Sequence, residues 1–229
     1  MIVSVGKSGL TSASPVIDLP ALRAQFDREH YIRFSDFVES EVLDFVQRQI
    51  DAGDFYQRVH EGIASNKELC MAGNAGFGAL LLLVNDEKLF QIIQAVAQCA
   101  RIRSFEGRVY RVSAGQGHHD SWHNDVGEHR LVGMTINLGK EVYSGGALQI
   151  RERESGRIIS EVPNVHAGDA VIFRLSDKLQ HRITGIEGSA SKTAFAGWFK
   201  AEPNFSVMLR RPSRRAKVAQ RFEPRVVTG

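Results

Sequence analysis

Cysteine and long apolar runs are both scarce in this sequence of 229 residues. Its two cysteines, Cys70 and Cys99, are too few for a disulfide-stapled secreted domain and are not spaced for a metal-binding knuckle. The longest purely apolar run, residues 79–84, is far too short to cross a bilayer. The first ten residues lack the basic and then apolar stretches of a secretory signal. We therefore expect a reduced, cytoplasmic protein with no membrane partner.

Positive charge is in excess only at the end of the chain. The formal net charge is +3, and from residue 209 onward seven Lys or Arg stand against one acid, which leaves a net charge of −3 on the rest. We expect one domain over residues 1–208 and a basic tail over 209–229. The tail is compatible with an anionic partner or with a solvated extension, and it lacks the interleaved aromatics that would favour nucleic acid. The composition, 43% hydrophobic and 24% charged, is typical of a globular protein.

Helical periodicity is confined to the first 101 residues. Asp18 is suited to cap a helix with Pro20 in its first turn. An apolar stripe predicts a second helix over 39–52, which Gly53 would end, and a third helix begins at Asn85 or Asp86. Between the first two, residues 30–37 alternate as a strand does.

From about residue 102 onward, short strand patterns alternate with turn residues. The candidate strands are 107–113, 120–125, 130–138, 147–153, 157–162, 170–175, 180–186 and 193–200. Eight strands at this spacing are typical of an antiparallel jelly roll. We predict a mainly β protein with N-terminal helices, in which a double-stranded β-helix (jelly-roll) core over 102–200 is flanked by the α-helices of 1–101.

The segment Ser121-Trp-His-Asn-Asp125 and the distant His181 carry side chains suited to a metal. Residues i and i+2 of a strand point to the same face, so His123 and Asp125 can present an imidazole and a carboxylate to one ion. His181 would complete the set. Two histidines and one carboxylate on a triangular face leave three coordination positions open, an arrangement typical of non-haem Fe(II) oxygenases.

A His-x-acid pair is not specific by itself. Eight histidines and 26 acids in 229 residues give about one such pair by chance. A second pair does occur, His118 with Asp120. We prefer the later pair because His118 directly follows the turn at 115–117 and should lie at a loop mouth.

The features around the later pair follow one order along residues 107–200. They are Val109-Tyr-Arg-Val-Ser-Ala-Gly115, His123-Asn-Asp125, Thr135-Ile-Asn-Leu138, Gly145-Gly-Ala-Leu148, Gly168-Asp-Ala-Val-Ile-Phe173, and His181-Arg182 followed by Lys192 and Gly197-Trp-Phe199. This order resembles the 2-oxoglutarate- and Fe(II)-dependent dioxygenases, specifically the branch similar to prolyl 4-hydroxylase catalytic domains.

The resemblance implies that His123, Asp125 and His181 are the catalytic Fe(II) ligands and that Lys192 pairs with the far carboxylate of 2-oxoglutarate. A dicarboxylate needs a cation at its remote end, and such a charge-assisted bond is worth about 1.5–3 kcal/mol. Some relatives place a hydroxyl residue two positions after the basic one, where this sequence has Ala194. The second hydrogen bond must then come from elsewhere, and strand parity offers Tyr110, Thr135 and Asn137.

The implied activity is hydroxylation of a C–H bond of an amino-acid-like or peptidyl substrate, with release of succinate and CO2. Dioxygen is the further cosubstrate, and ascorbate is a candidate reductant. The alternative is a cupin-like metal-binding protein or isomerase, which would not need Lys192. The candidate substrate contacts are Arg151, Arg153, His118 and His119, although the two arginines also suit a solvated strand face. Trp122 and Trp198 are expected to serve in packing.

The polar stretch 54–78 contains glycines and shows no clear period. Loops longer than about 12–15 residues in a compact domain are usually functional or disordered. We predict that this stretch is a loop that closes over the site, with Arg58, His60 or Lys67 reaching the substrate.

Overall fold

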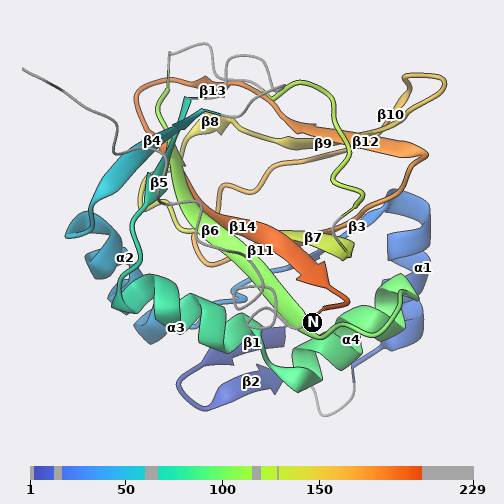
Figure 1. The fold of residues 1–229 in the computed structure, drawn as a ribbon, viewed down its shortest axis with the longest axis horizontal. Helices are drawn as coiled ribbons and strands as arrows, with labels where there is room; N and C mark the ends of the chain where they lie inside the picture. The colour runs from blue at the N-terminus through green and yellow to red at the C-terminus, as the bar shows by residue number, and fades with distance from the viewer. Residues whose placement is uncertain (1–2, 13–16, 60–66, 115–119, 128, 203–229) are drawn as a thin grey trace, which may run out of the picture.

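Two facing antiparallel sheets form the centre of the molecule (Figure 1). A computed structural model describes residues 3–12, 17–59, 67–114, 120–127 and 129–202. The larger sheet holds, in spatial order, β3 (Tyr31–Phe34), β11 (Ala170–Arg174), β7 (Arg130–Asn137), β14 (Lys192–Lys200), β6 (Ser104–Val112), β5 (Lys67–Met71) and β4 (Phe55–Val59). The smaller sheet holds β10 (Ile158–Val162), β9 (Leu148–Glu152) and β12 (Leu179–Ile183). Two-stranded pairs are formed by β1 (Val3–Gly6) with β2 (Gly9–Ser12) and by β8 (Ser144–Gly145) with β13 (Ile186–Glu187).

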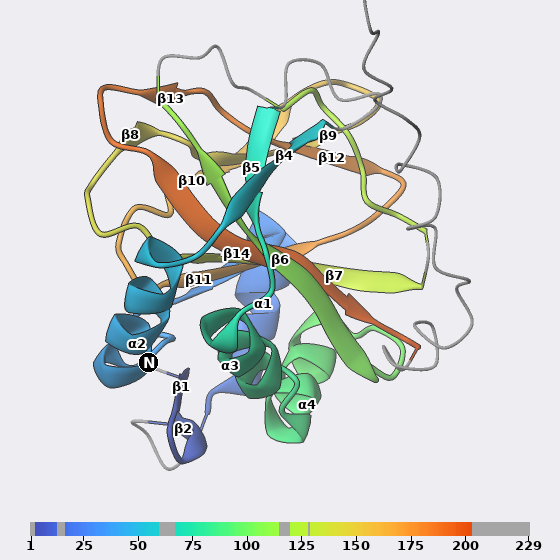
Figure 2. The same ribbon diagram turned by 60° about the vertical axis from the view of Figure 1, so that its left-hand side comes forward.

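Four helices cover the larger sheet on the side away from the smaller one (Figure 2). They are α1 (Leu19–Glu29), α2 (Ser40–Asp51), α3 (Ala75–Val84) and α4 (Glu87–Ala97). Asp18 caps α1 through the amide of Ala21, and Asp86 caps α4, as the sequence predicts. Helix α3 was not predicted because it is apolar on all sides and shows no amphipathic period. The predicted class, a mainly β jelly-roll core with flanking helices, is confirmed.

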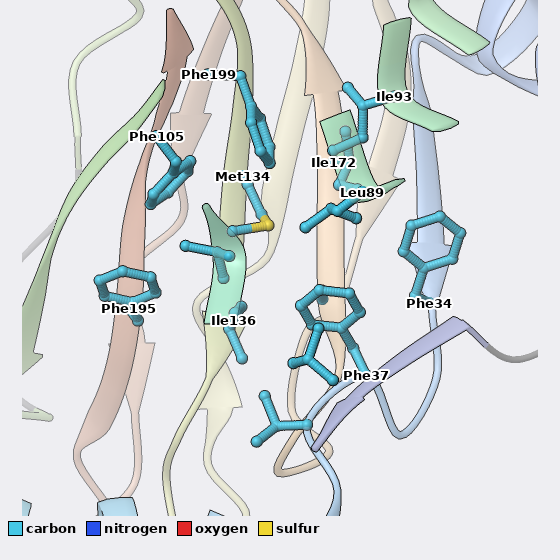
Figure 3. Packing of buried hydrophobic residues seen from close by; sticks show 14 of the residues in the cluster. Phe34, Phe37, Leu89, Ile93, Phe105, Met134, Ile136, Ile172, Phe195 and Phe199 are labelled. Carbon is cyan, nitrogen blue, oxygen red and sulfur yellow. The ribbon is translucent and has the colours of Figure 1, made fainter. Parts of the chain in front are cut away.

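Strand β14 contributes side chains to the hydrophobic core on one face and to the cavity between the two sheets on the other. Phe195 and Phe199 are fully buried toward the helices, where Phe105 lies 5.4 and 4.9 Å from their ring centroids (Figure 3). Because successive side chains of a strand alternate between faces, Lys192, Ala196 and Trp198 point the other way, toward the smaller sheet. The packing of one face thus orients the polar residues of the other.

The structure corrects the prediction of a loop over 54–78. This stretch supplies β4, β5 and the first turn of α3, and β5 extends the larger sheet by pairing Leu69 with Arg111 and Cys70 with Tyr110 of β6. Its strand character depends on a partner some forty residues away in sequence, so its local pattern does not reveal it. Residues 60–66, which include His60, lie outside the described residues, and Lys67 begins β5.

Two other predicted strands also change. Residues 120–125 form no strand; a single bridge joins His123 to His181. The predicted strand 180–186 is divided between β12 and β13. The basic tail over 209–229 lies outside the described residues. In the described ranges, no helix combines the length and the apolar character required to span a bilayer.

Candidate metal and cosubstrate site

A cavity of about 230 Å³ lies between the inner faces of the two sheets. The larger sheet lines it with Tyr110, Thr135, Lys192 and Trp198, among others, and the smaller sheet with Leu148 and His181. His123 and Asp125 reach the same cavity from the segment beside β12. The topology thus gathers most of the predicted site residues in one cavity.

His123, Asp125 and His181 come together in the lining of this cavity. Their ligand atoms all lie within 4.8 Å of one another. Nε2 of His181 lies 3.2 Å from Oδ2 of Asp125, and Nε2 of His123 lies 3.9 Å from the same oxygen. Nδ1 of His123 donates to the carbonyl oxygen of Ser121 at 2.8 Å in the tautomer that leaves Nε2 as a lone-pair donor. The three side chains could hold one metal ion.

The electrostatics of the cluster favour the protonation states that bind a metal. Burial lowers the pKa of His181 despite the opposing hydrogen bond to Asp125, so its imidazole is neutral at neutral pH. Burial alone would raise the pKa of Asp125, but hydrogen bonds from His181 and Trp198 outweigh it, and that pKa is lowered. A neutral imidazole and an ionised carboxylate are the forms that coordinate metals.

Asp125 contacts an indole and a guanidinium group, those of Trp198 and Arg130, which were not assigned to the site from the sequence. Nε1 of Trp198 donates to Oδ2 at 2.9 Å, and a guanidinium nitrogen of Arg130 lies 3.4 Å from Oδ1. The Arg130 guanidinium also lies 3.8 Å from the centre of the Trp198 ring. Trp198 therefore lies at the candidate metal site and not in the core. Its parity with Lys192 on β14 was a signal that could have found it.

The same cavity presents an ammonium group. Lys192 is 1% exposed, and its Nζ donates to the carbonyl oxygen of Gly146 at 2.7 Å. Burial lowers its pKa to about 8, against an opposing attraction from Asp120. Among the described residues, Thr135 Oγ1 is buried without a hydrogen-bond partner. A buried cation and an unsatisfied hydroxyl in one cavity fit the remote carboxylate of a small dicarboxylate.

The two other candidate cosubstrate contacts differ in position. Tyr110 lines the cavity, and burial raises the pKa of its phenol, which stays protonated and able to donate. Asn137 is fully buried, and its Oδ1 accepts from the amide of Gly139 at 3.2 Å. Asn137 is not among the residues that line the cavity.

The candidate substrate residues lie outside the cavity where they are described. Arg151 donates to Oε1 of Gln180 on the outer face of the smaller sheet, and Arg153 is exposed in the turn after β9. Neither arginine lines the cavity. His118 and His119 lie outside the described residues.

A group of charged residues that the sequence analysis did not find lines the cavity near Trp198. Arg108 forms two hydrogen bonds with Glu68, at 2.7 and 3.0 Å, and Arg58 lies 3.9 Å from the same carboxylate. Glu68 and Arg58 belong to β5 and β4, the strands that had been predicted as a loop. Of the three, Arg58 alone was predicted from the sequence as a substrate contact.

One further cluster of potential ligands occurs among the described residues, formed by Asp36, His166 and Asp169. Asp169 is almost fully buried, forms an ion pair with Arg33 and accepts a hydrogen bond from the amide of Asp36. These contacts already account for the Asp169 carboxylate, so this cluster serves to attach β3 to β11.

Part of the chain matches a known protein family. Residues 107–200 match the model of the 2OG-Fe(II) oxygenase superfamily. No curated protein matches the chain in sequence. A prolyl 4-hydroxylase from Pseudomonas putida is similar in structure, with a TM-score of 0.59 and 18% identity over 80% of this chain and 99% of that one.

Two further structures are similar over most of their length. A prolyl hydroxylase from Trichoplax adhaerens, in complex with a hypoxia inducible factor peptide fragment, gives a TM-score of 0.62 and 15% identity over 85% of this chain and 93% of that one. The non-heme alpha ketoglutarate dependent epimerase SnoN from nogalamycin biosynthesis gives a TM-score of 0.58 and 13% identity over 92% of this chain and 96% of that one. At these identities the likeness establishes a shared fold. On that fold, the match over residues 107–200 confirms the recognition from sequence: this segment is a 2OG-Fe(II) oxygenase domain, of the class of non-haem iron enzymes that uses Fe(II), 2-oxoglutarate and dioxygen.

Proposed function

We propose that this oxygenase hydroxylates a C–H bond of an amino-acid-like or peptidyl substrate and converts 2-oxoglutarate to succinate and CO2. The observation that carries the proposal is the presence, in one cavity, of a two-histidine, one-carboxylate cluster and of a buried ammonium. Each of these features is common alone, but together they supply what a metal-bound dicarboxylate requires at its two ends.

In this proposal His123, Asp125 and His181 hold Fe(II), which when bound supplies the activation of dioxygen. Trp198 keeps Asp125 in its ionised, oriented form through the 2.9 Å hydrogen bond to Oδ2. Lys192 receives the remote carboxylate of 2-oxoglutarate, and the Thr135 hydroxyl, which lacks a partner among the described residues, donates the second hydrogen bond.

The cupin-like alternative leaves Lys192 unexplained. No described carboxylate forms an ion pair with this 1% exposed ammonium, whose Nζ donates to one backbone carbonyl. Burial lowers the pKa of this ammonium despite the attraction of Asp120, so that attraction does not offset the cost of burying the charge, whereas an anionic ligand would. A protein that did not bind an anion at this position would have no use for the cation.

The substrate enters, in this proposal, on the side of the cavity lined by Arg58, Arg108 and Trp198. Arg108 is held by two hydrogen bonds to Glu68, whereas Arg58 is half-exposed and lies 3.9 Å from that carboxylate. Arg58 is thus the guanidinium better able to turn toward a carboxylate of the substrate. The peptide fragment bound by the hydroxylase from Trichoplax adhaerens supports a peptidyl ligand.

The decisive experiment measures succinate and product together. The Fe(II)-loaded protein is incubated with 2-oxoglutarate, dioxygen and a panel of free amino acids and peptides. We expect one class to stimulate succinate formation and to gain one oxygen atom by mass spectrometry. A product of unchanged mass would indicate epimerisation, as in the nogalamycin enzyme, and failure to bind 2-oxoglutarate would favour the cupin alternative.

The role of Arg58 has its own test. Arg58→Ala should raise the KM for the substrate that this panel identifies while leaving the affinity for 2-oxoglutarate unchanged. Arg101→Ala is the matched control, because Arg101 is exposed and does not line the cavity. Equal KM values for the two variants would remove Arg58 from the substrate site.

A further inference from the structure

The segment that carries His123 and Asp125 is joined to β12 by an isolated bridge and not as a strand of the sheet. His123 and His181 exchange two backbone hydrogen bonds, at 3.2 and 2.8 Å, and the amide of Asp120 donates to the carbonyl of Ile183 at 3.1 Å. Two candidate metal ligands therefore depend on contacts other than a regular ladder for their position.

Trp122 supplies such a contact on the opposite face of the same segment. Because neighbouring residues of an extended segment alternate between faces, Trp122 lies on the outer side of the smaller sheet while His123 points into the cavity. Its ring lies between two guanidinium groups, with that of Arg151 at 4.3 Å and that of Arg182 at 4.4 Å from the ring centre. The indole is thereby attached to both β9 and β12.

Both guanidinium groups are themselves fixed in place. Arg151 donates twice to Oε1 of Gln180, at 3.0 and 2.7 Å, and Arg182 donates to Oε1 of Gln149 at 2.8 Å. Gln149 is 8% exposed and donates in turn to Glu161 on β10. Stacking on arginines that are already ordered loses less side-chain entropy than stacking on free ones, so the attachment is rigid.

We propose that Trp122, held between Arg151 and Arg182, is a positioning residue for the metal site. It holds the segment 120–125 against β12 from the outer face, so that His123 and Asp125 present their ligand atoms beside His181. In other metal sites, groups that hydrogen-bond to the ligands keep them in position, and loss of such a partner costs about 10–100-fold in metal affinity. Here Trp122 would keep the ligands in position from the outer face of the smaller sheet. The inference rests on the metal site proposed above.

The test measures metal binding and not turnover. Binding of Mn(II) or Fe(II) is followed anaerobically by calorimetry in the full-length protein and in Trp122→Ala and Trp122→Phe. We expect an affinity about 10–100-fold weaker in Trp122→Ala, and within a few-fold of wild type in Trp122→Phe, since a phenyl ring keeps the cation–π contact. The amide of His123 should also exchange its hydrogen faster in Trp122→Ala.

A matched control separates this role from general stability. Arg111→Gln removes a cation–π contact of similar length, 4.5 Å to Phe55, outside the metal site. It should lower the melting temperature without weakening metal binding. If Trp122→Ala fails to fold, the double variant Arg151→Gln, Arg182→Gln leaves the indole in place and should show the same loss of affinity.

The possible failures are distinguishable. Unchanged metal affinity in Trp122→Ala, or an equal loss in Arg111→Gln, would overturn the role of Trp122 while leaving the metal site intact. A wild-type protein that takes up no metal would instead refute the metal site itself.

Discussion

Replacing Lys192 with methionine removes the proposed anchor of 2-oxoglutarate while keeping most of the side-chain volume. The ammonium is 1% exposed and lines the cavity that contains the metal cluster. A hydrogen bond to a charged group contributes about 1.5–3 kcal/mol, so Lys192→Met should weaken 2-oxoglutarate binding by about 10- to 150-fold. Fe(II) should remain bound, because Lys192 contributes no metal ligand. Calorimetry with 2-oxoglutarate and the metal-loaded protein measures both quantities.

Lys192 should also make the affinity for 2-oxoglutarate depend on pH. Its pKa of about 8 in the folded protein means that the ammonium loses its proton as the pH rises through that value. If the charged form alone binds the dicarboxylate, affinity should be flat below about pH 7 and about tenfold weaker at pH 9. In Lys192→Met the affinity should not change over this range.

Unfolding of the protein at high pH would not explain the expected loss of 2-oxoglutarate affinity. The pKa of Lys192 in the folded state lies below its unfolded value of 10.5, so between about pH 8 and 10.5 the unfolded chain binds more protons. The contribution of this group to stability therefore rises with pH in that window, opposite to the loss of affinity. Melting curves at each pH check the sign.

Lys200 provides the matched control on the same strand. It is 4% exposed and bound to Glu106 at 2.9 Å, and it does not line the cavity. Lys200→Met should reduce stability without changing 2-oxoglutarate affinity. The reasoning is refuted if Lys192→Met binds 2-oxoglutarate as tightly as wild type, or if both variants lose affinity equally.

Three further predictions concern the ligands and the sheet. Asp125→Ala should abolish metal binding and metal-dependent turnover, whereas Asp120→Ala should keep the metal; equal losses by calorimetry would mean that the wrong His-x-acid pair was chosen. Metal at a hundredfold excess over its Kd should stabilise the protein by about 2.7 kcal/mol, and a chelator should reverse the shift in Tm. Gly197→Ala should destabilise by about 3 kcal/mol in urea denaturation, because its Cβ would overlap the Glu106 carbonyl of β6, while Gly78→Ala, which has open space in α3, should stabilise by about 0.5–1 kcal/mol.

The sequence by itself determined the features whose signals are local. Caps at Asp18 and Asp86, the stripe over 39–52 and regularly spaced turn glycines were enough to predict helices followed by a jelly roll. The order of the motifs along residues 107–200, His123, Asp125, His181 and Lys192 among them, was enough to recognise the oxygenase family, now confirmed by the match over 107–200. These signals can be read from the sequence alone. Caps and periodicity involve residues a few positions apart, and the motifs follow a fixed order along the chain.

Only the tertiary structure decided which distant residues share the cavity. The residues 54–78 showed no strand period, and β5 is a strand because it pairs with β6 in the folded sheet. For the same reason Glu68 reaches Arg108, Trp198 reaches Asp125, and Trp122 lies between Arg151 and Arg182. Each of these contacts joins residues 29 to 73 positions apart in the sequence, and its geometry follows from sheet register and packing, which no local pattern contains.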